Sequence, residues 1–122
     1  MRLFIQSRLN EISDVECGGF LPESIIENGV TYFGYELQSN FISQDYSKND
    51  VRRISIIGFV IRREQSNENT LQIVDEATKE IVNKLKELNF KISTQDITFS
   101  ENIRKIKVTG NVTYNGINNE LI

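Results

Sequence analysis

The stretch NTLQIVDEATKEIVNKLKELN, residues 69–89, decides how this chain folds. Its apolar residues recur at intervals of three and four, which places them along one side of an α-helix. They are Leu71, Val74, Ala77, Ile81, Leu85 and Leu88. Asn69 is expected to be the N-cap, with Gln72 completing a capping box, and Asn89 suits a left-handed C-cap. A helix of about 20 residues, roughly 30 Å long, can lie across a sheet of four or more strands.

Four strand patterns surround this helix, two before it and two after it. They cover residues 30–42, 51–62, 90–99 and 103–114. These stretches are rich in the β-branched and aromatic side chains that favour strands. The last of them alternates apolar and polar residues, so we expect it to have one buried face and one wet face. The second is apolar on both sides at its centre, which indicates either a position inside the sheet or cover on both faces.

Two further sets of apolar residues are expected to meet the long helix in the core. Residues 1–12 predict a short second helix, because Ile5, Leu9 and Ile12 recur at helical spacing. On the first long strand, one side carries Phe33, Tyr35, Leu37 and Phe41. Their shared parity favours core packing over a platform for stacking bases.

Turn signals separate the elements. Asn28-Gly29 tolerates positive φ at both central positions of a type I′ turn, so a hairpin is predicted there, preceded by Ile25 to Glu27. Residues 43–50 and 63–69 are polar and without periodicity, and are expected to be loops. Leu121 and Ile122 end the sequence as an apolar pair that is expected to dock on the domain or on a neighbour.

Together these patterns predict one α+β domain over residues 1–122. We expect two layers, a mostly antiparallel β-sheet packed by a long amphipathic helix and a short N-terminal helix. The antiparallel arrangement follows from the short connections between successive strands.

Composition excludes several classes of function. The chain has 122 residues and a formal net charge of −3, without the basic excess typical of a dedicated nucleic-acid binder. It contains no histidine and one cysteine, Cys17, which excludes the common zinc sites and an intrachain disulfide. We find no apolar run long enough to span a bilayer, no secretory signal and no phosphate-binding glycine loop. We therefore expect no enzyme activity, no metal and no cofactor.

The paired arginines are the most suggestive polar feature. Arg52-Arg53 and Arg62-Arg63 bracket the second strand, and Lys105 and Lys107 lie on the wet side of the last one. They are candidate contacts to DNA or to a neighbouring subunit. The alternative is that the arginines are solvated strand ends that prevent edge aggregation. A candidate assembly loop lies between the first two long strands and contains Asp45, Tyr46, Lys48 and Asp50.

The order of these stretches resembles the tail terminator, or tail completion, proteins of long-tailed bacteriophages and prophages. The resemblance rests on the N-terminal helix, the strands TYFGYEL (31–37) and RISIIGFV (53–60), the helix from VDEA (74–77) to Leu88, and paired strands ending at Tyr114. It covers nearly the whole chain as a pattern of elements and apolar positions. The family has no active-site residues to carry over.

The resemblance implies a structural protein of the virion that forms a ring, often hexameric. Such a ring caps the tail tube and joins it to the head connector, so the expected partners are further copies, the tail tube protein and the head–tail connector protein. DNA would pass through the ring without sequence recognition. The protein would be made in the cytoplasm of the bacterial host and act at the head–tail junction of the virion, with no membrane partner.

Three other readings stay open. The first is another head–tail connector, neck or minor capsid or tail protein, which would share this composition and fold. The second is a host binding module with a preformed apolar pocket in the monomer. The third is an enzyme whose carboxylates meet only in space, because seventeen acidic residues supply many chance pairs.

Overall fold

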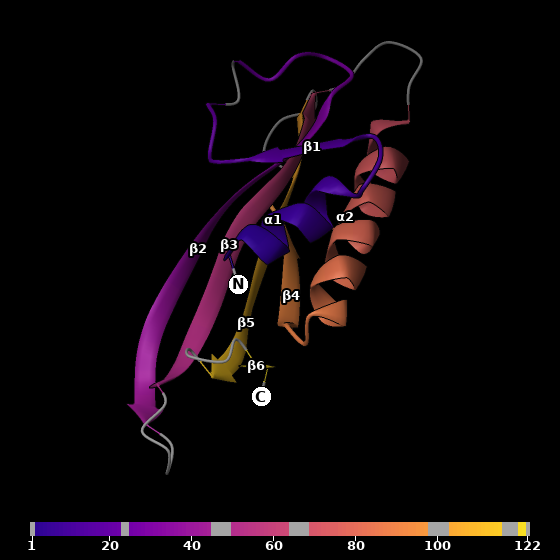
Figure 1. The fold of residues 1–122 in the computed structure, drawn as a ribbon. Helices are drawn as coiled ribbons and strands as arrows, with labels where there is room; N and C mark the ends of the chain where they lie inside the picture. Colours follow the sequence, from indigo (N-terminus) through magenta and orange to yellow (C-terminus); the bar gives the residue numbers. More distant parts are fainter. Residues whose placement is uncertain are drawn as a thin grey trace.

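Two helices lie on one face of a long, curved β-sheet (Figure 1). The computed structural model describes residues 2–22, 25–44, 50–63, 69–97, 103–115 and 120–121. The elements are α1 (Arg2–Asn10), β1 (Val15–Gly18), β2 (Thr31–Gln44), β3 (Asp50–Arg63), α2 (Thr70–Glu87), β4 (Lys91–Asp96), β5 (Ile103–Asn115) and β6 (Glu120–Leu121). Both predicted helices and all four predicted long strand regions are therefore present, with ends shifted by a few residues.

The sheet has six strands in the order β1-β2-β3-β5-β4, and β6 pairs with the end of β5. All pairings are antiparallel except that of β1 with β2. The predicted two-layer α+β fold with a mostly antiparallel sheet is confirmed. β3 lies at the centre, one of the two arrangements that its apolar residues on both sides indicated, and β6 pairs the tail of the chain with its own sheet.

The start of α2 follows the predicted cap. The Asn69 side chain accepts a hydrogen bond from the backbone N–H of Gln72 at 3.3 Å. The reciprocal half of the capping box differs, because the Gln72 side chain accepts a bond from the Asn69 side chain at 3.1 Å. Leu71 was expected in the core, but it is 53% exposed. In the first turn Thr70 is buried instead, and the buried apolar stripe begins at Val74.

The end of α2 is closed by a left-handed residue, as predicted. Asn89 has φ 67°, and its N–H donates to the carbonyl of Lys86 at 2.9 Å. The N–H of Phe90 donates to the carbonyl of Leu85 at 3.1 Å. These bonds satisfy carbonyls that the helix leaves open, and they turn the buried Phe90 back onto the last turn. The chain can then enter β4 directly.

The core lies between the helices and one face of the sheet. Ile5 and Leu9 of α1 and Ile81 and Leu85 of α2 are fully buried against it. The sheet contributes Phe33, Tyr35, Leu37, Ile54, Ile56, Val60, Ile106, Val108, Val112 and Tyr114. Each fully buried side chain of this kind contributes about 1.5–3 kcal/mol. The alternation predicted for residues 103–114 is confirmed, since its even-numbered residues face the helices.

Phe41 departs from this pattern. It shares the parity of Phe33, Tyr35 and Leu37, which are buried, yet it is 56% exposed. The reason is length, because β2 is exposed from Gln38 to Gln44 and in Figure 1 it runs beyond the end of α2 together with β3. The expectation that Phe41 packs in the core is therefore wrong.

The hairpin predicted at Asn28-Gly29 is also wrong, although a turn is present. The N–H of Val30 donates to the carbonyl of Glu27 at 3.3 Å, and only Gly29 has positive φ, at 82°. A type I′ turn needs positive φ at both central residues. Residues 25–27, directly before this turn, do not form a strand, and β2 instead pairs in parallel with β1, a strand that the turn-rich sequence around Cys17 concealed.

Ion pairs fasten the helices to each other and to the sheet. Arg8 of α1 contacts Glu11 at 3.0 Å and also contacts Glu87 of α2, while Lys84 reaches Glu11 at 3.2 Å. On the sheet, Arg104 pairs with Asp75 at 3.3 Å and with Asp96. Exposed pairs of this kind contribute about 0–1 kcal/mol each, so they orient the helices more than they stabilise them.

Candidate functional site

The two predicted arginine pairs are divided between the two faces of the sheet. Successive residues of a strand point to opposite sides, so neither pair acts as a unit. Arg52 and Arg62 share the parity of the core residues Ile54 and Val60, on the helix side. Arg53 is exposed on the opposite face, while Arg63 is half-buried there and donates to the carbonyl of Ile26 at 3.3 Å. Among these arginines, Arg53 is left on the open part of the sheet.

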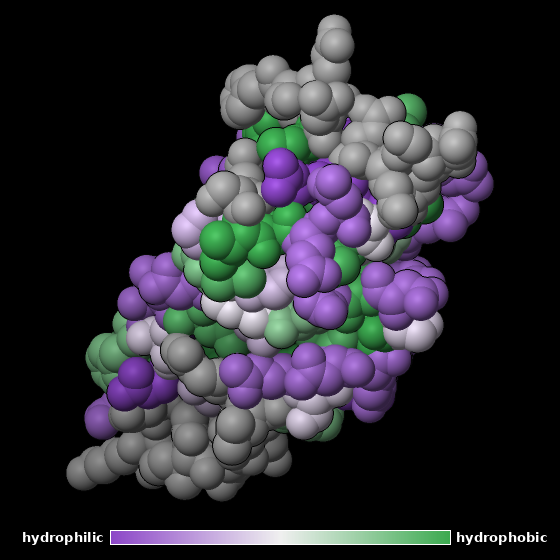
Figure 2. Space-filling view, turned by 90° about the horizontal axis from the view of Figure 1, so that it is seen from above, coloured by the Kyte–Doolittle hydropathy of each residue, from purple (hydrophilic) through white to green (hydrophobic). Residues whose placement is uncertain are grey.

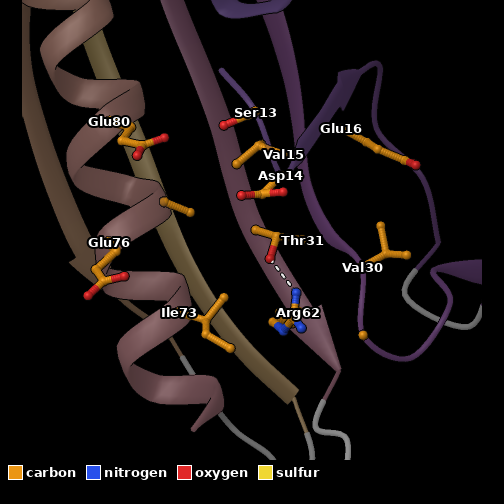
Figure 3. A pocket seen from close by; sticks show the side chains of 12 residues that line it. Ser13, Asp14, Val15, Glu16, Val30, Thr31, Arg62, Ile73, Glu76 and Glu80 are labelled. Carbon is orange, nitrogen blue, oxygen red and sulfur yellow. Dashed lines mark hydrogen bonds between the residues drawn. The ribbon is translucent and has the colours of Figure 1, made fainter. Parts of the chain in front are cut away.

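Arg62 lies at the base of a groove on the helix side. Its side chain is 8% exposed, and Nη1 donates to the hydroxyl of Thr31 at 2.7 Å, the bond drawn in Figure 3. Burial lowers the pKa of this guanidinium from its ordinary value. An arginine remains charged even so, because its ordinary pKa is very high. The sequence suggested a surface contact, and the structure instead makes Arg62 a buried cation.

The groove above Arg62 has a volume of about 650 Å³ and runs between β1 and α2. Asp14 lines it from the turn before β1, and Glu76 and Glu80 line it from α2. All three are exposed, and among the described residues none of them forms an ion pair. Glu16 also borders the groove, but its side chain points away from α2 in Figure 3. We call this feature the acidic groove and define it by Asp14, Glu76 and Glu80.

The face of the sheet opposite the helices carries the remaining candidate cations. Lys105 and Lys107 of β5 point to this side, as predicted, and the register adds Arg53 of β3 and Lys91 of β4. We call Arg53, Lys91, Lys105 and Lys107 the basic face. Serine, threonine and amide side chains lie between them, and two shallow hollows of about 340 and 350 Å³ follow β4 and β5. Lys91 was missed because its strand showed no clear alternation in sequence.

At one end of this face, aromatic residues meet Lys105. Its Nζ lies 4.6 Å from the centre of the Phe59 ring, a cation–π contact. Phe20 also packs on Phe59, with ring centres 5.9 Å apart, and a hollow of about 180 Å³ opens beside the two rings. Phe20 and Leu21 remain 49% and 41% exposed. Seen from above, hydrophobic side chains reach the surface between hydrophilic ones (Figure 2).

A second exposed apolar group lies at the far end of β2. Phe41 is 56% and Ile42 is 42% exposed, within the fully exposed segment from Gln38 to Gln44. We call this segment the exposed end of β2. β1 pairs only with residues 31–34, so no described strand lies beside this end on the side away from β3. Sequence parity alone placed Phe41 in the core and gave no sign of this feature.

The predicted assembly loop lies largely outside the described residues. This applies to Asp45, Tyr46 and Lys48, and Asp50 is the first residue of β3. The same holds for most of the second predicted loop, since 64–68 lie outside the described part. The chemistry of the site is therefore built from the strands and from α2.

The described residues offer charge and shape, with little reactive chemistry. Burial raises the pKa of the Cys17 thiol to about 11, so at neutral pH it is protonated, and it lies 3.8 Å from the carbonyl oxygen of Leu9. Burial, with Cys17 and Glu16 nearby, also raises the pKa of Tyr32, whose hydroxyl donates to the carbonyl of Gly19 at 2.6 Å. Within the described ranges, no three His, Cys, Asp or Glu side chains gather as metal ligands.

Comparison of the chain with protein-family models and with curated proteins yields no match. Among the described helices, none is long and apolar enough to cross a bilayer.

Proposed function

We propose that this protein is a structural subunit of a bacteriophage or prophage tail, a tail terminator that forms a ring on the end of the tail tube and joins it to the head connector. The sequence resemblance suggests this role, and one structural observation supports it most directly. That observation is the exposed end of β2, with Phe41 and Ile42 presented to solvent on an open strand.

An open strand with apolar side chains is a hazard in a monomer. Its unpaired N–H and C=O groups can pair with another chain, and proteins usually protect such edges with charges, prolines or bulges. Here the seven residues from Gln38 to Gln44 carry neither charge nor proline. Of the three protective features, this segment has only a register shift in its pairing with β3, between Phe41 and Ser43. Burial against a neighbouring subunit would remove the hazard, which is why this feature suits a ring or tube-end protein.

The experiment measures assembly in solution. We expect the protein, alone or mixed with the tail tube protein of the same phage, to form a closed oligomer by light scattering. We expect the double substitution Phe41→Ser/Ile42→Ser to abolish this assembly while leaving the melting temperature of the subunit within a few degrees, because both side chains are exposed. Leu71→Ser, which changes a residue of similar exposure on α2, is the control and should assemble normally.

Electron microscopy of the mixture then locates the protein. Density confined to the ends of tail tubes is the expected result for a terminator, whereas binding along their sides would exclude that role. A protein that remains strictly monomeric at high concentration, both alone and with tube subunits, would refute the proposal.

A further inference from the structure

The charges of this chain are unevenly distributed between its faces. The open side of the sheet holds the four cations of the basic face together with Arg63, and two acids, Glu16 on β1 and Glu36 on β2. This side is thus net positive by three charges in a chain whose formal charge is −3. The rest of the chain then holds nine cations against fifteen acids, a net charge of −6. Outside this side of the sheet, a second copy therefore carries a net negative charge.

Ion pairs inside the subunit show which charges are left for a partner. Among the described acids, Glu11, Glu87, Asp75 and Asp96 are each held by an arginine or lysine of the same chain. Asp14, Glu76 and Glu80 form no such pair within the described residues, although they surround a groove of about 650 Å³. On the other side of the sheet, Arg53, Lys91 and Lys107 likewise form no ion pair with a described acid. Among the described residues, three acids without such a pair therefore border the groove on the helix side, and three cations without one lie on the open side of the sheet.

We propose that copies of this chain associate head to tail, with the basic face of one molecule lying against the acidic groove of the next. The two surfaces do not overlap, because one lies on the helix side of the sheet and the other on the open side. Such a contact is heterologous, so each added copy exposes the same surface again and the chain of copies closes into a ring when the rotation permits. This inference rests on the ring-forming role proposed above, and it names the surfaces that meet.

Charge reversal tests the contact. Lys91→Glu/Lys107→Glu makes the basic face acidic, and Glu76→Lys/Glu80→Lys makes the groove basic. Like charges then face each other, so each double variant should self-associate at least about tenfold more weakly than the wild type at low salt. The wild type itself should dissociate as salt rises, because salt screens exposed charges. Circular dichroism confirms that each variant is folded.

Restoration distinguishes a specific contact from a general charge effect. When the two double variants are mixed, each acidic face meets a basic groove and each basic face meets an acidic groove, so assembly should return. The fourfold variant, with both surfaces reversed in one chain, should also assemble by itself. The control is Lys79→Glu/Lys86→Glu on the solvent side of α2, which changes the net charge as much as the first variant and should assemble as the wild type does.

The outcomes separate this inference from the proposed function. If the wild type forms a ring and both double variants form it equally well, the contact is wrong and the tail role stands. Failure of both the mixture and the fourfold variant to assemble would also overturn the contact. A monomeric wild type, alone and with tube subunits, overturns both proposals. If Lys91→Glu/Lys107→Glu assembles normally and instead loses binding to duplex DNA, the basic face serves a nucleic acid and the proposal is refuted.

Discussion

Replacing Gly58 with alanine should destabilise the fold, because the added methyl group has no room at the centre of β3. Gly58 lies at the centre of β3, opposite Tyr35, where the ring of Phe33 crosses it. A Cβ placed there would lie 2.5 Å from Cε1 and 2.8 Å from Cζ of Phe33, and 2.8 Å from Cβ of Tyr35. Favourable carbon–carbon contacts are about 3.5–4.0 Å, so each of these atoms is too close by roughly 1 Å.

The neighbours have little room to move. Phe33 is fully buried and Tyr35 is 9% exposed, and the two rings stack with centres 5.2 Å apart. Overpacking a core of this kind costs about 1–3 kcal/mol. Replacing glycine also restricts the unfolded chain, which returns about 0.4–1 kcal/mol. The middle of these two ranges gives a net loss of about 1.3 kcal/mol, which lowers the melting temperature by roughly 4 °C for each kcal/mol.

Urea titration of Gly58→Ala beside the wild type, at equal protein concentration, measures this loss. Gly19→Ala is the matched control, because a Cβ there meets no heavy atom within 4 Å and should change stability by less than about 0.5 kcal/mol. Adding Phe33→Leu to Gly58→Ala should recover part of the loss, since the clashing ring atoms are removed. Equal stability of Gly58→Ala and Gly19→Ala would contradict this prediction. So would a double variant in which the effects of Gly58→Ala and Phe33→Leu on stability simply add.

Two other predictions concern the helix cap and the single thiol. Asn69→Ala removes the acceptor for the N–H of Gln72 and should cost about 1 kcal/mol in urea titration, whereas Asn69→Asp, which keeps an acceptor, should cost much less. Cys17 has its pKa raised from 9.0 to about 11 in the fold, so the folded state binds its proton more tightly than the unfolded state does. The stability contributed by the protonated thiol is full below about pH 9 and is lost as pH rises toward about 11. The stability of Cys17→Ala should therefore fall less steeply over that range, and identical pH profiles for the two proteins would contradict the raised pKa.

Much of the architecture could be predicted from the sequence, because it depends on local periodicity. The stripe from Val74 to Leu88 fixes a helix, and the alternation of residues 103–114 fixes a strand with one buried face, whatever the rest of the chain does. The caps at Asn69 and Asn89 were predictable for the same reason, since a cap is made by residues within one turn of the helix end. The fold class followed, because one apolar stripe and alternating strands can be buried together only as a helix layer on a sheet.

The surfaces on which the two proposals rest were harder to predict from the sequence. Alternation correctly placed Lys105 and Lys107 on the wet side of the last strand, but Arg53 and Lys91 joined them only through the pairing of β3 and β4 with β5. Asp14 and Glu76 are 62 positions apart in the numbering and meet around one groove because β1 and α2 lie on either side of it. No local sequence pattern predicts that these two distant acidic residues lie around the same groove.

The sequence by itself determined the two helices and the four long strands, and the apolar side of the long helix and of the last strand, because those properties repeat every two or 3.6 residues within a single element. Only the tertiary structure decided where the helices stop covering the sheet, and therefore that Phe33 is buried while Phe41, of the same parity, is exposed. It also decided that Arg62 is buried beside Thr31 while its neighbour Arg63 reaches Ile26. Burial depends on what lies across from a residue, and that partner is supplied by segments distant in the chain.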